Sequence, residues 1–193
     1  MRKNRILLIC GLLLALTACS SIRQQAPSRV TLAKDHPFTL PQPNSYPQKI
    51  TATQLVSGKY KQQTHSLQFQ VEQSPERLVL VGISPWGGEL FSANWDGKEI
   101  KTSSLPAVSK QLQPLYMLAD FIITYYPAKV LSPLLARGGM TLQDTPLTRS
   151  VLVDGKPLIQ INYQYPDHWR GKITYRHIQR HYSLTIETIQ AQH

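Results

Sequence analysis

The chain has 193 residues, with 21 lysines and arginines against 11 aspartates and glutamates, so its formal net charge is +10. This length is enough for one domain with a hydrophobic core of its own. The only cysteines are Cys10 and Cys19, which excludes a cysteine-rich zinc cluster and a scaffold held by several disulfides.

The first 18 residues have the organisation of an export signal. Arg2, Lys3 and Arg5 make the start positively charged, and the apolar run from Ile6 to Leu16 has the length of a secretory segment. We therefore expect residues 1–18 to be a signal peptide that is removed from the mature protein. A membrane anchor is the alternative interpretation of this stretch.

The residues LTAC at positions 16–19 match the lipobox at which bacterial lipoproteins are processed. We expect cleavage before Cys19 and acylation of Cys19, and several acyl chains on one residue anchor a protein much more firmly than one chain does. Ser20 stands where an aspartate would indicate retention in the inner membrane. The expected location is therefore the periplasmic face of the outer membrane. A conventional signal peptide with a chance cysteine is the alternative.

Processing would change both the charge and the cysteine content. The mature chain would carry a net charge of +7, because three positive residues and no acidic one leave with the signal. A basic protein beside an anionic lipid surface gains a modest attraction to it. The same compartment argues against a nucleic-acid partner. With Cys10 removed and Cys19 acylated, no thiol remains for a disulfide, a nucleophile or a metal.

Residues 19–48 contain five prolines among glutamine, serine and asparagine, without a sustained apolar period. This composition predicts a semi-extended, proline-rich tether between the acylated N-terminus and the folded domain. The domain would then comprise residues 49–193.

Two sets of strands are expected in this domain. Leu67, Phe69 and Val71 alternate with polar residues, as in a strand with one buried face, and the Asp-Gly pairs at 96–97 and 154–155 indicate tight hairpin turns. The pattern predicts about five strands before a helical insertion and about five after it, at 50–61, 67–72, 77–84, 89–95 and 98–103, then at 140–144, 148–154, 157–165, 171–179 and 182–189. This order favours an antiparallel sheet over a parallel one.

The insertion is apolar on nearly every side. Between Leu115 and Tyr126 the only polar residues are Asp120 and Thr124, with tyrosine counted as apolar. A helix that ends before Pro127 would be about 20 Å long, too short for a bilayer core of about 30 Å. A helix without a polar face needs cover on more than one side. The expected fold class is therefore α+β, an antiparallel incomplete β-barrel of about ten strands with a mid-chain helical lid.

Helical spacing places one continuous apolar stripe on this insertion. We expect the stripe to face the concave side of the sheet and to form a removable lid over an acyl-chain site. A helix that is permanently packed as core would have the same stripe, so the sequence leaves both interpretations open. The stripe consists of Leu115, Leu118, Phe121, Ile122 and Tyr125.

No motif indicates an enzyme, a cofactor or a metal site. The patterns GxSxG and HExxH and a glycine-rich phosphate loop are absent. His177 and His181 are four residues apart across an expected turn, so we expect two separate surface histidines. Asp120 is expected at an exposed edge or in a cap-like hydrogen bond, with a buried functional carboxylate as the alternative. A serine or histidine buried beside Asp120 would favour a hydrolase.

The order of these segments resembles the LolA/LolB superfamily of lipoprotein carriers. Residues 77–135, which run from LVLVGISPWGGELFSANWDGKEI into the apolar insertion, are most similar to the outer-membrane receptor LolB. The chain also looks like an uncharacterised family of outer-membrane lipoproteins, some of them associated with aryl polyene gene clusters. The resemblance implies a half-barrel with a helical lid, whose apolar cavity takes up acyl chains. It also implies acylated cargo and a periplasmic carrier protein as partners.

Trp86, in the sequence SPWGG, occupies the loop at which the LolB receptor carries an exposed apolar residue for membrane delivery. The receptor has leucine there, whereas tryptophan prefers the membrane interface, so contact with headgroups is expected rather than deep insertion. The alternative is that Trp86 folds back onto the sheet.

The expected function is thus a non-enzymatic, lipid-anchored protein that binds or transfers a lipid or acyl chain, with lipoproteins or an aryl polyene lipid as the cargo. The competing interpretation is a structural or assembly lipoprotein that docks a protein partner through its sheet edge or its basic face.

Overall fold

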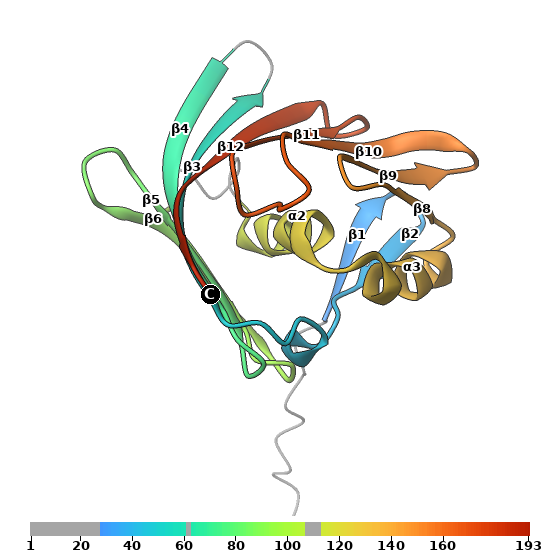
Figure 1. Cartoon of the computed structure of the whole chain (residues 1–193), viewed down its shortest axis with the longest axis horizontal. Helices are drawn as coiled ribbons and strands as arrows, with labels where there is room; N and C mark the ends of the chain where they lie inside the picture. Colours follow the sequence, from blue (N-terminus) through green and yellow to red (C-terminus); the bar gives the residue numbers. More distant parts are fainter. Residues whose placement is uncertain (1–27, 61–62, 107–112) are drawn as a thin grey trace, which may run out of the picture.

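The computed structural model describes residues 28–60, 63–106 and 113–193, so the predicted signal peptide and Cys19 lie outside the described residues. Its main element is a ten-stranded sheet with the strand order β7-β6-β5-β4-β3-β12-β11-β10-β9-β8. All neighbouring strands are antiparallel. The edge strands β7 and β8 stand at opposite ends of this order, so the sheet is curved but does not close into a barrel (Figure 1).

The strands come from two halves of the chain. The first half supplies β3 (Ile50–Tyr60), β4 (Gln63–Gln73), β5 (Leu78–Ile83), β6 (Glu89–Trp95) and β7 (Ile100–Ser104). The second half supplies β8 (Thr141–Asp144), β9 (Thr148–Val153), β10 (Lys156–Tyr163), β11 (Lys172–His177) and β12 (Tyr182–Gln192). The last strand, β12, pairs with β3 and joins the two halves. The prediction of an incomplete antiparallel barrel interrupted by helices is confirmed.

Alternation of side chains determines which face of each strand is buried. In β11, Ile173, Tyr175 and His177 are buried and the residues between them are exposed. Gly82 in β5 shows how tightly the core is packed, because a Cβ atom there would lie 2.2 Å from the Phe91 ring on the neighbouring strand. The backbone of β5 therefore supports an aromatic ring at a point where any larger residue would collide with it.

Two helices separate the halves, α2 (Pro114–Tyr125) and α3 (Ala128–Arg137). Pro114 lies in the first turn of α2, where its missing N–H costs little, and Pro127 precedes α3 as its N-cap. Gly139 ends the helical segment with a left-handed φ of 73°. Figure 1 shows α2 on the concave side of the sheet, and α3 towards its open side.

The tether prediction is wrong for residues 28–48. Part of this segment forms a hairpin of β1 (Arg29–Ala33) and β2 (His36–Thr39), followed by the short 3-10 helix η2 (Pro43–Ser45). Val30 and Phe38 are buried in the same core as the main sheet. The five prolines led to the prediction of a linker although the segment also contains a short apolar alternation. Proline is tolerated in β2 because each strand of a two-stranded sheet has a free edge.

Candidate functional site

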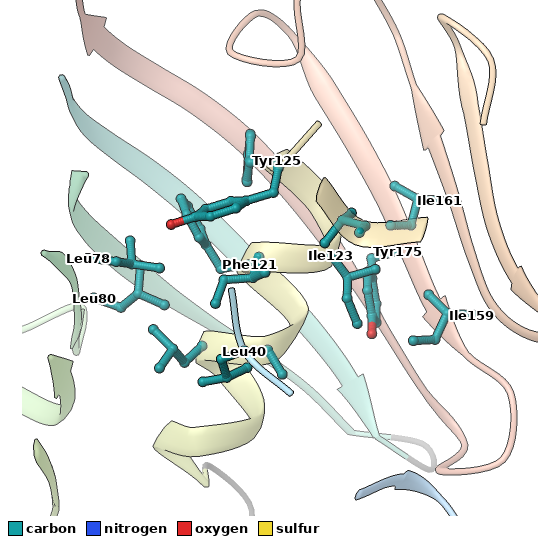
Figure 2. Packing of buried hydrophobic residues seen from close by; sticks show 14 of the residues in the cluster. Leu40, Leu78, Leu80, Phe121, Ile123, Tyr125, Ile159, Ile161 and Tyr175 are labelled. Carbon is teal, nitrogen blue, oxygen red and sulfur yellow. The ribbon is translucent and has the colours of Figure 1, made fainter. Parts of the chain in front are cut away.

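Helix α2 is enclosed rather than half-exposed. Of the predicted stripe, Leu118, Phe121, Ile122 and Tyr125 are buried and Leu115 is half-buried. Residues on the other sides of the helix are buried too, among them Ala119, Ile123 and Thr124. Figure 2 shows side chains of β5, β10 and β11 arranged around α2. The structure thus brings the stripe residues together in the interior, on a helix that is buried on all sides from Leu118 onward.

The cover on the side away from the sheet comes from two segments. The β1–β2 hairpin contacts α2 through β1, and the loop between β10 and β11 descends onto the helix (Figure 1). Trp169 of that loop stacks on Tyr125 with ring centroids 4.3 Å apart and lies 6.0 Å from Phe121. Its indole nitrogen donates a hydrogen bond of 2.9 Å to the hydroxyl of Tyr46, which follows η2. The aromatic cover therefore involves three segments that are distant in sequence.

Asp120 is buried inside this interior, with 4% of its surface exposed, so the expectation of an exposed edge is wrong. The hydroxyl of Tyr175 on β11 donates a hydrogen bond of 2.5 Å to one carboxylate oxygen, and Tyr182 on β12 donates to the other. Burial raises the pKa of Asp120 to about 6, against the opposing effect of the two phenol donors. The carboxylate thus joins α2 to the two strands behind it.

His177 is also buried, which corrects the expectation of a surface histidine; His181 is exposed as expected. The His177 ring lies 5.5 Å from the Tyr182 ring, and burial lowers the pKa of His177 to about 4, with the charge of Arg180 acting in the same direction. Within the described residues no hydrogen bond joins His177 to Asp120, whose partners are the two phenols. Asp120 and His177 therefore do not form a direct hydrogen-bonded pair.

Arg180, in the turn between β11 and β12, links three elements near this cluster. Its guanidinium carbon lies 3.5 Å from the centroid of the Tyr116 ring on α2, a cation–π contact. The same guanidinium donates a hydrogen bond to the main-chain carbonyl of Thr31 on β1. Arg180 therefore holds the hairpin against the first turn of α2.

Arg149 on β9 anchors the other end of α2 and was not predicted from the sequence. Its guanidinium is 3% exposed and donates to the main-chain carbonyls of Ile123, Thr124 and Tyr126 at 2.7, 3.2 and 2.9 Å. It also forms a bidentate pair with Asp144, at 2.7 and 3.1 Å. Carbonyls at a helix C-terminus lack partners within the helix, and a cation there also interacts favourably with the helix dipole.

Further polar contacts surround the same end of the helix. The amide of Gln54 donates to the hydroxyl of Tyr125 at 2.6 Å, and the hydroxyl of Tyr126 donates to Gln73 at 2.8 Å. Tyr163 donates its hydroxyl to the Thr124 carbonyl at 2.7 Å. Helix α2 is thus apolar in composition but is positioned by specific hydrogen bonds along its length.

Trp86 lies far from this interior, in the tight turn between β5 and β6. Its side chain is 90% exposed, so it does not fold back onto the sheet. The turn is closed by a hydrogen bond of 2.9 Å from the Gly87 amide to the Ser84 carbonyl, and Gly87 has a left-handed φ of 90°. The most exposed large apolar side chain in the described part of the chain therefore stands on a well-defined turn.

Two further observations bear on the site. None of the described helices has the length and hydropathy needed to span a bilayer. Among residues 28–60, 63–106 and 113–193, no three histidine, cysteine, aspartate or glutamate side chains gather closely enough to hold a metal ion.

Comparison with known proteins gives structural matches and a match to a family model. The fold is similar to the crystal structure of a LolA superfamily protein from Nitrosomonas europaea, with a TM-score of 0.43 and 8% identity over 84% of this chain and 93% of that one. No curated protein matches the chain. Residues 51–190, which include all ten strands of the main sheet in whole or in part, match one family model. The chain belongs to the family described as protein of unknown function DUF3261.

Proposed function

We propose that this protein is an outer-membrane lipoprotein that binds an acyl chain on the concave side of its open sheet. Its role would be that of an acceptor or carrier like LolB, for lipoproteins or an aryl polyene lipid. The observation that carries the proposal is an apolar helix, α2, enclosed with aromatic side chains inside a sheet whose edges are not joined. Because β7 and β8 do not pair, the interior can widen without breaking a strand ladder.

The free energy gained by burying an acyl chain is large enough to offset the exposure of side chains that it displaces. An acyl chain gains about 0.8 kcal/mol for each buried methylene, so ten methylenes contribute roughly 8 kcal/mol. Exposing one large apolar side chain costs about 1.5–3 kcal/mol. A bound chain can therefore offset the displacement of several side chains. In this proposal the stripe of α2 lines the acyl site, with Phe121 near its centre (Figure 2).

Membrane attachment completes the proposal. Only residues 20–27 separate Cys19 from the first described residue, and eight extended residues span at most about 28 Å. Acylation of Cys19 would therefore hold the domain close to the bilayer, where exposed Trp86 can contact headgroups. Labelling with a palmitate analogue should be lost in Cys19→Ala, and Ser20→Asp should retain the protein in the inner membrane.

The acyl site can be tested with the mature chain carrying Cys19→Ser, exported behind a conventional leader. Titration with a fluorescent fatty acid should show saturable binding. Phe121→Ser, which places a hydroxyl on the acyl surface, should weaken binding about tenfold, or about 1.4 kcal/mol. The matched control is Ile189→Ser, because Ile189 is 65% exposed. Absence of saturable binding to the parent protein would contradict the proposal.

The second candidate is a structural or assembly lipoprotein. The edge strands β7 and β8 favour it, because the edge of a sheet can accept a strand from a partner protein. This function needs no acyl site. A parent protein that binds no fatty acid, yet co-purifies with one periplasmic protein until a proline is placed in β8, would favour this candidate.

A further inference from the structure

The β1–β2 hairpin is attached to the domain in a different way from every other strand. It forms a separate two-stranded sheet that shares no ladder with the ten-stranded sheet. A two-stranded hairpin is at best marginally stable by itself, so packing must hold it in place. Its inward side chains Val30, Leu32 and Phe38 are buried in the common core, together with Leu40, which directly follows β2.

The polar contacts of the hairpin involve main-chain carbonyls. Arg180 donates to the Thr31 carbonyl on β1, and the ring of His36 on β2 contacts the Gly138 carbonyl at 2.9 Å. Just beyond the hairpin, Trp95 donates at 2.7 Å to the carbonyl of Pro41, two residues after β2. Water can replace the partners of Arg180 and His36 once the hairpin moves away, because both side chains are partly exposed. Release of α2 would instead leave the buried carboxylate of Asp120 without its two phenol partners and would take three carbonyl partners from the buried guanidinium that caps the helix, which is far more costly.

We propose that the β1–β2 hairpin occupies the acyl-chain site and is displaced by a linear acyl chain, while α2 stays in place as the floor of the site. This inference rests on the proposed function and specifies which element moves. A five-residue strand is about 16 Å long and presents its apolar side chains in a single row, as an extended acyl chain presents its methylenes. A linear chain therefore matches the hairpin in shape, whereas a broad sterol does not.

Arg180 sets how often the hairpin is open. Its hydrogen bond to the Thr31 carbonyl exists only when the hairpin lies on α2, and its cation–π contact with Tyr116 holds the guanidinium in place for that bond. A ligand that binds only the open state has an apparent affinity reduced by the fraction of open molecules. Weakening this contact should therefore tighten acyl binding, whereas damage to a ligand-binding residue would weaken it.

The test uses the mature chain with Cys19→Ser and an uncharged fluorescent ester of a sixteen-carbon fatty acid, which removes direct attraction to cations. Arg180→Ala should raise the apparent affinity about three- to tenfold. Arg180→Lys, which keeps the charge but loses the planar stacking, should give an intermediate value. The matched control, Arg176→Ala, removes an exposed positive charge from the adjacent strand and should stay within about twofold of the parent.

Hydrogen exchange identifies the moving element directly. On binding the ester, peptides covering residues 28–40 should exchange faster, while peptides covering 114–125 should keep their protection. Binding that exposes α2 and leaves the hairpin protected would overturn the inference and leave the proposed function standing. A parent protein that binds neither the ester nor the fatty acid would overturn both.

Discussion

Helix α2 and the inward face of the β1–β2 hairpin are both buried on the concave side of the same sheet, but different forces hold the two elements. The helix carries Asp120 between two tyrosines and is capped by Arg149, whereas the hairpin is held by apolar side chains and hydrogen bonds to carbonyls. An acyl chain can replace apolar contacts, but it cannot pair with a carboxylate or a guanidinium. Burial alone therefore does not distinguish permanent core from a displaceable segment; the buried charges do.

The largest effect is expected at the cap of α2. Arg149→Ala should lower the free energy of unfolding by about 3–5 kcal/mol, because it removes the buried partner of Asp144 and a donor to three main-chain carbonyls, of which, among the described residues, only that of Thr124 keeps a second donor, Tyr163. Urea unfolding measures this difference. Arg77→Ala is the matched control, since the Arg77–Glu72 pair is about half-exposed and should contribute no more than about 1 kcal/mol. Equal losses in the two variants would mean that α2 is not anchored by charge.

Asp120 should give the helix a distinct dependence on pH. Its pKa rises from 3.8 to about 6 on folding, so its contribution to stability is present below pH 3.8 and is lost as the pH rises through 6. His177 acts oppositely, because its pKa falls from 6.5 to about 4 and its contribution is lost as the pH falls through this range. Each effect amounts to about 3 kcal/mol, so the two nearly cancel in the parent protein.

Asp120→Asn removes only the first of these effects. We therefore expect the variant to lose about 3 kcal/mol of stability between pH 6.5 and pH 4, where the parent protein changes little. Urea unfolding at the two pH values gives the comparison. Asp154→Asn, at an exposed turn position with a left-handed φ of 49°, should behave like the parent. A profile of Asp120→Asn that coincides with that of the parent would show that the carboxylate is already well solvated.

A substitution that weakens the attachment of the hairpin should lower the free energy of unfolding by less than the changes at α2. Trp95→Phe keeps most of the buried ring but removes the N–H that donates to the Pro41 carbonyl, so the expected loss is about 1–2 kcal/mol. Hydrogen exchange should increase in residues 28–40 and remain unchanged in α2. Faster exchange in both elements would mean that the hairpin and the helix open as one unit. Trp86→Phe, at an exposed site, is the control.

The smallest change in stability is expected at Trp86, which contacts neither the hairpin nor the helix. Trp86→Ser should alter the free energy of unfolding by less than about 0.5 kcal/mol. It should nevertheless weaken binding of the Cys19→Ser mature chain to vesicles of phosphatidylethanolamine and phosphatidylglycerol. Unchanged vesicle binding would mean that Trp86 does not contribute to membrane contact. A large loss of stability would contradict the 90% exposure of this residue.

The sequence was most informative where the structure depends on neighbouring residues. Pro114, Pro127 and Gly139 mark the helix boundaries, and the Asp-Gly turns place the hairpins, because caps and turns are local. The apolar residues on nearly every side of α2 predicted that this helix would be enclosed. The tether was predicted wrongly because its five prolines indicated an extended linker. The apolar residues Val30, Leu32, Phe38 and Leu40 are few, and the surface that they pack against belongs to other segments of the chain.

The buried polar contacts could not be predicted in the same way. Tyr175 and Tyr182 are 55 and 62 residues from Asp120, and Arg149 is 23 residues or more from each carbonyl that it caps. Sequence spacing has no bearing on such contacts, since the strand register determines which side chains meet. A carboxylate such as that of Asp120 is unusual in an apolar helix. Its presence indicated that the side chain would need polar partners, but the sequence did not identify Tyr175 and Tyr182 as those partners.

The sequence by itself determined the antiparallel character of the sheet, the position of the apolar helix and the loop that carries Trp86, because these follow from periodicity and turn chemistry. Only the tertiary structure decided that Asp120 and His177 are buried and that Arg149 caps α2. It also decided that residues 28–48 belong to the domain. The physical reason is that burial and pairing of charge depend on which distant segments the curved sheet brings together, and those contacts are set by strand register rather than by local propensity.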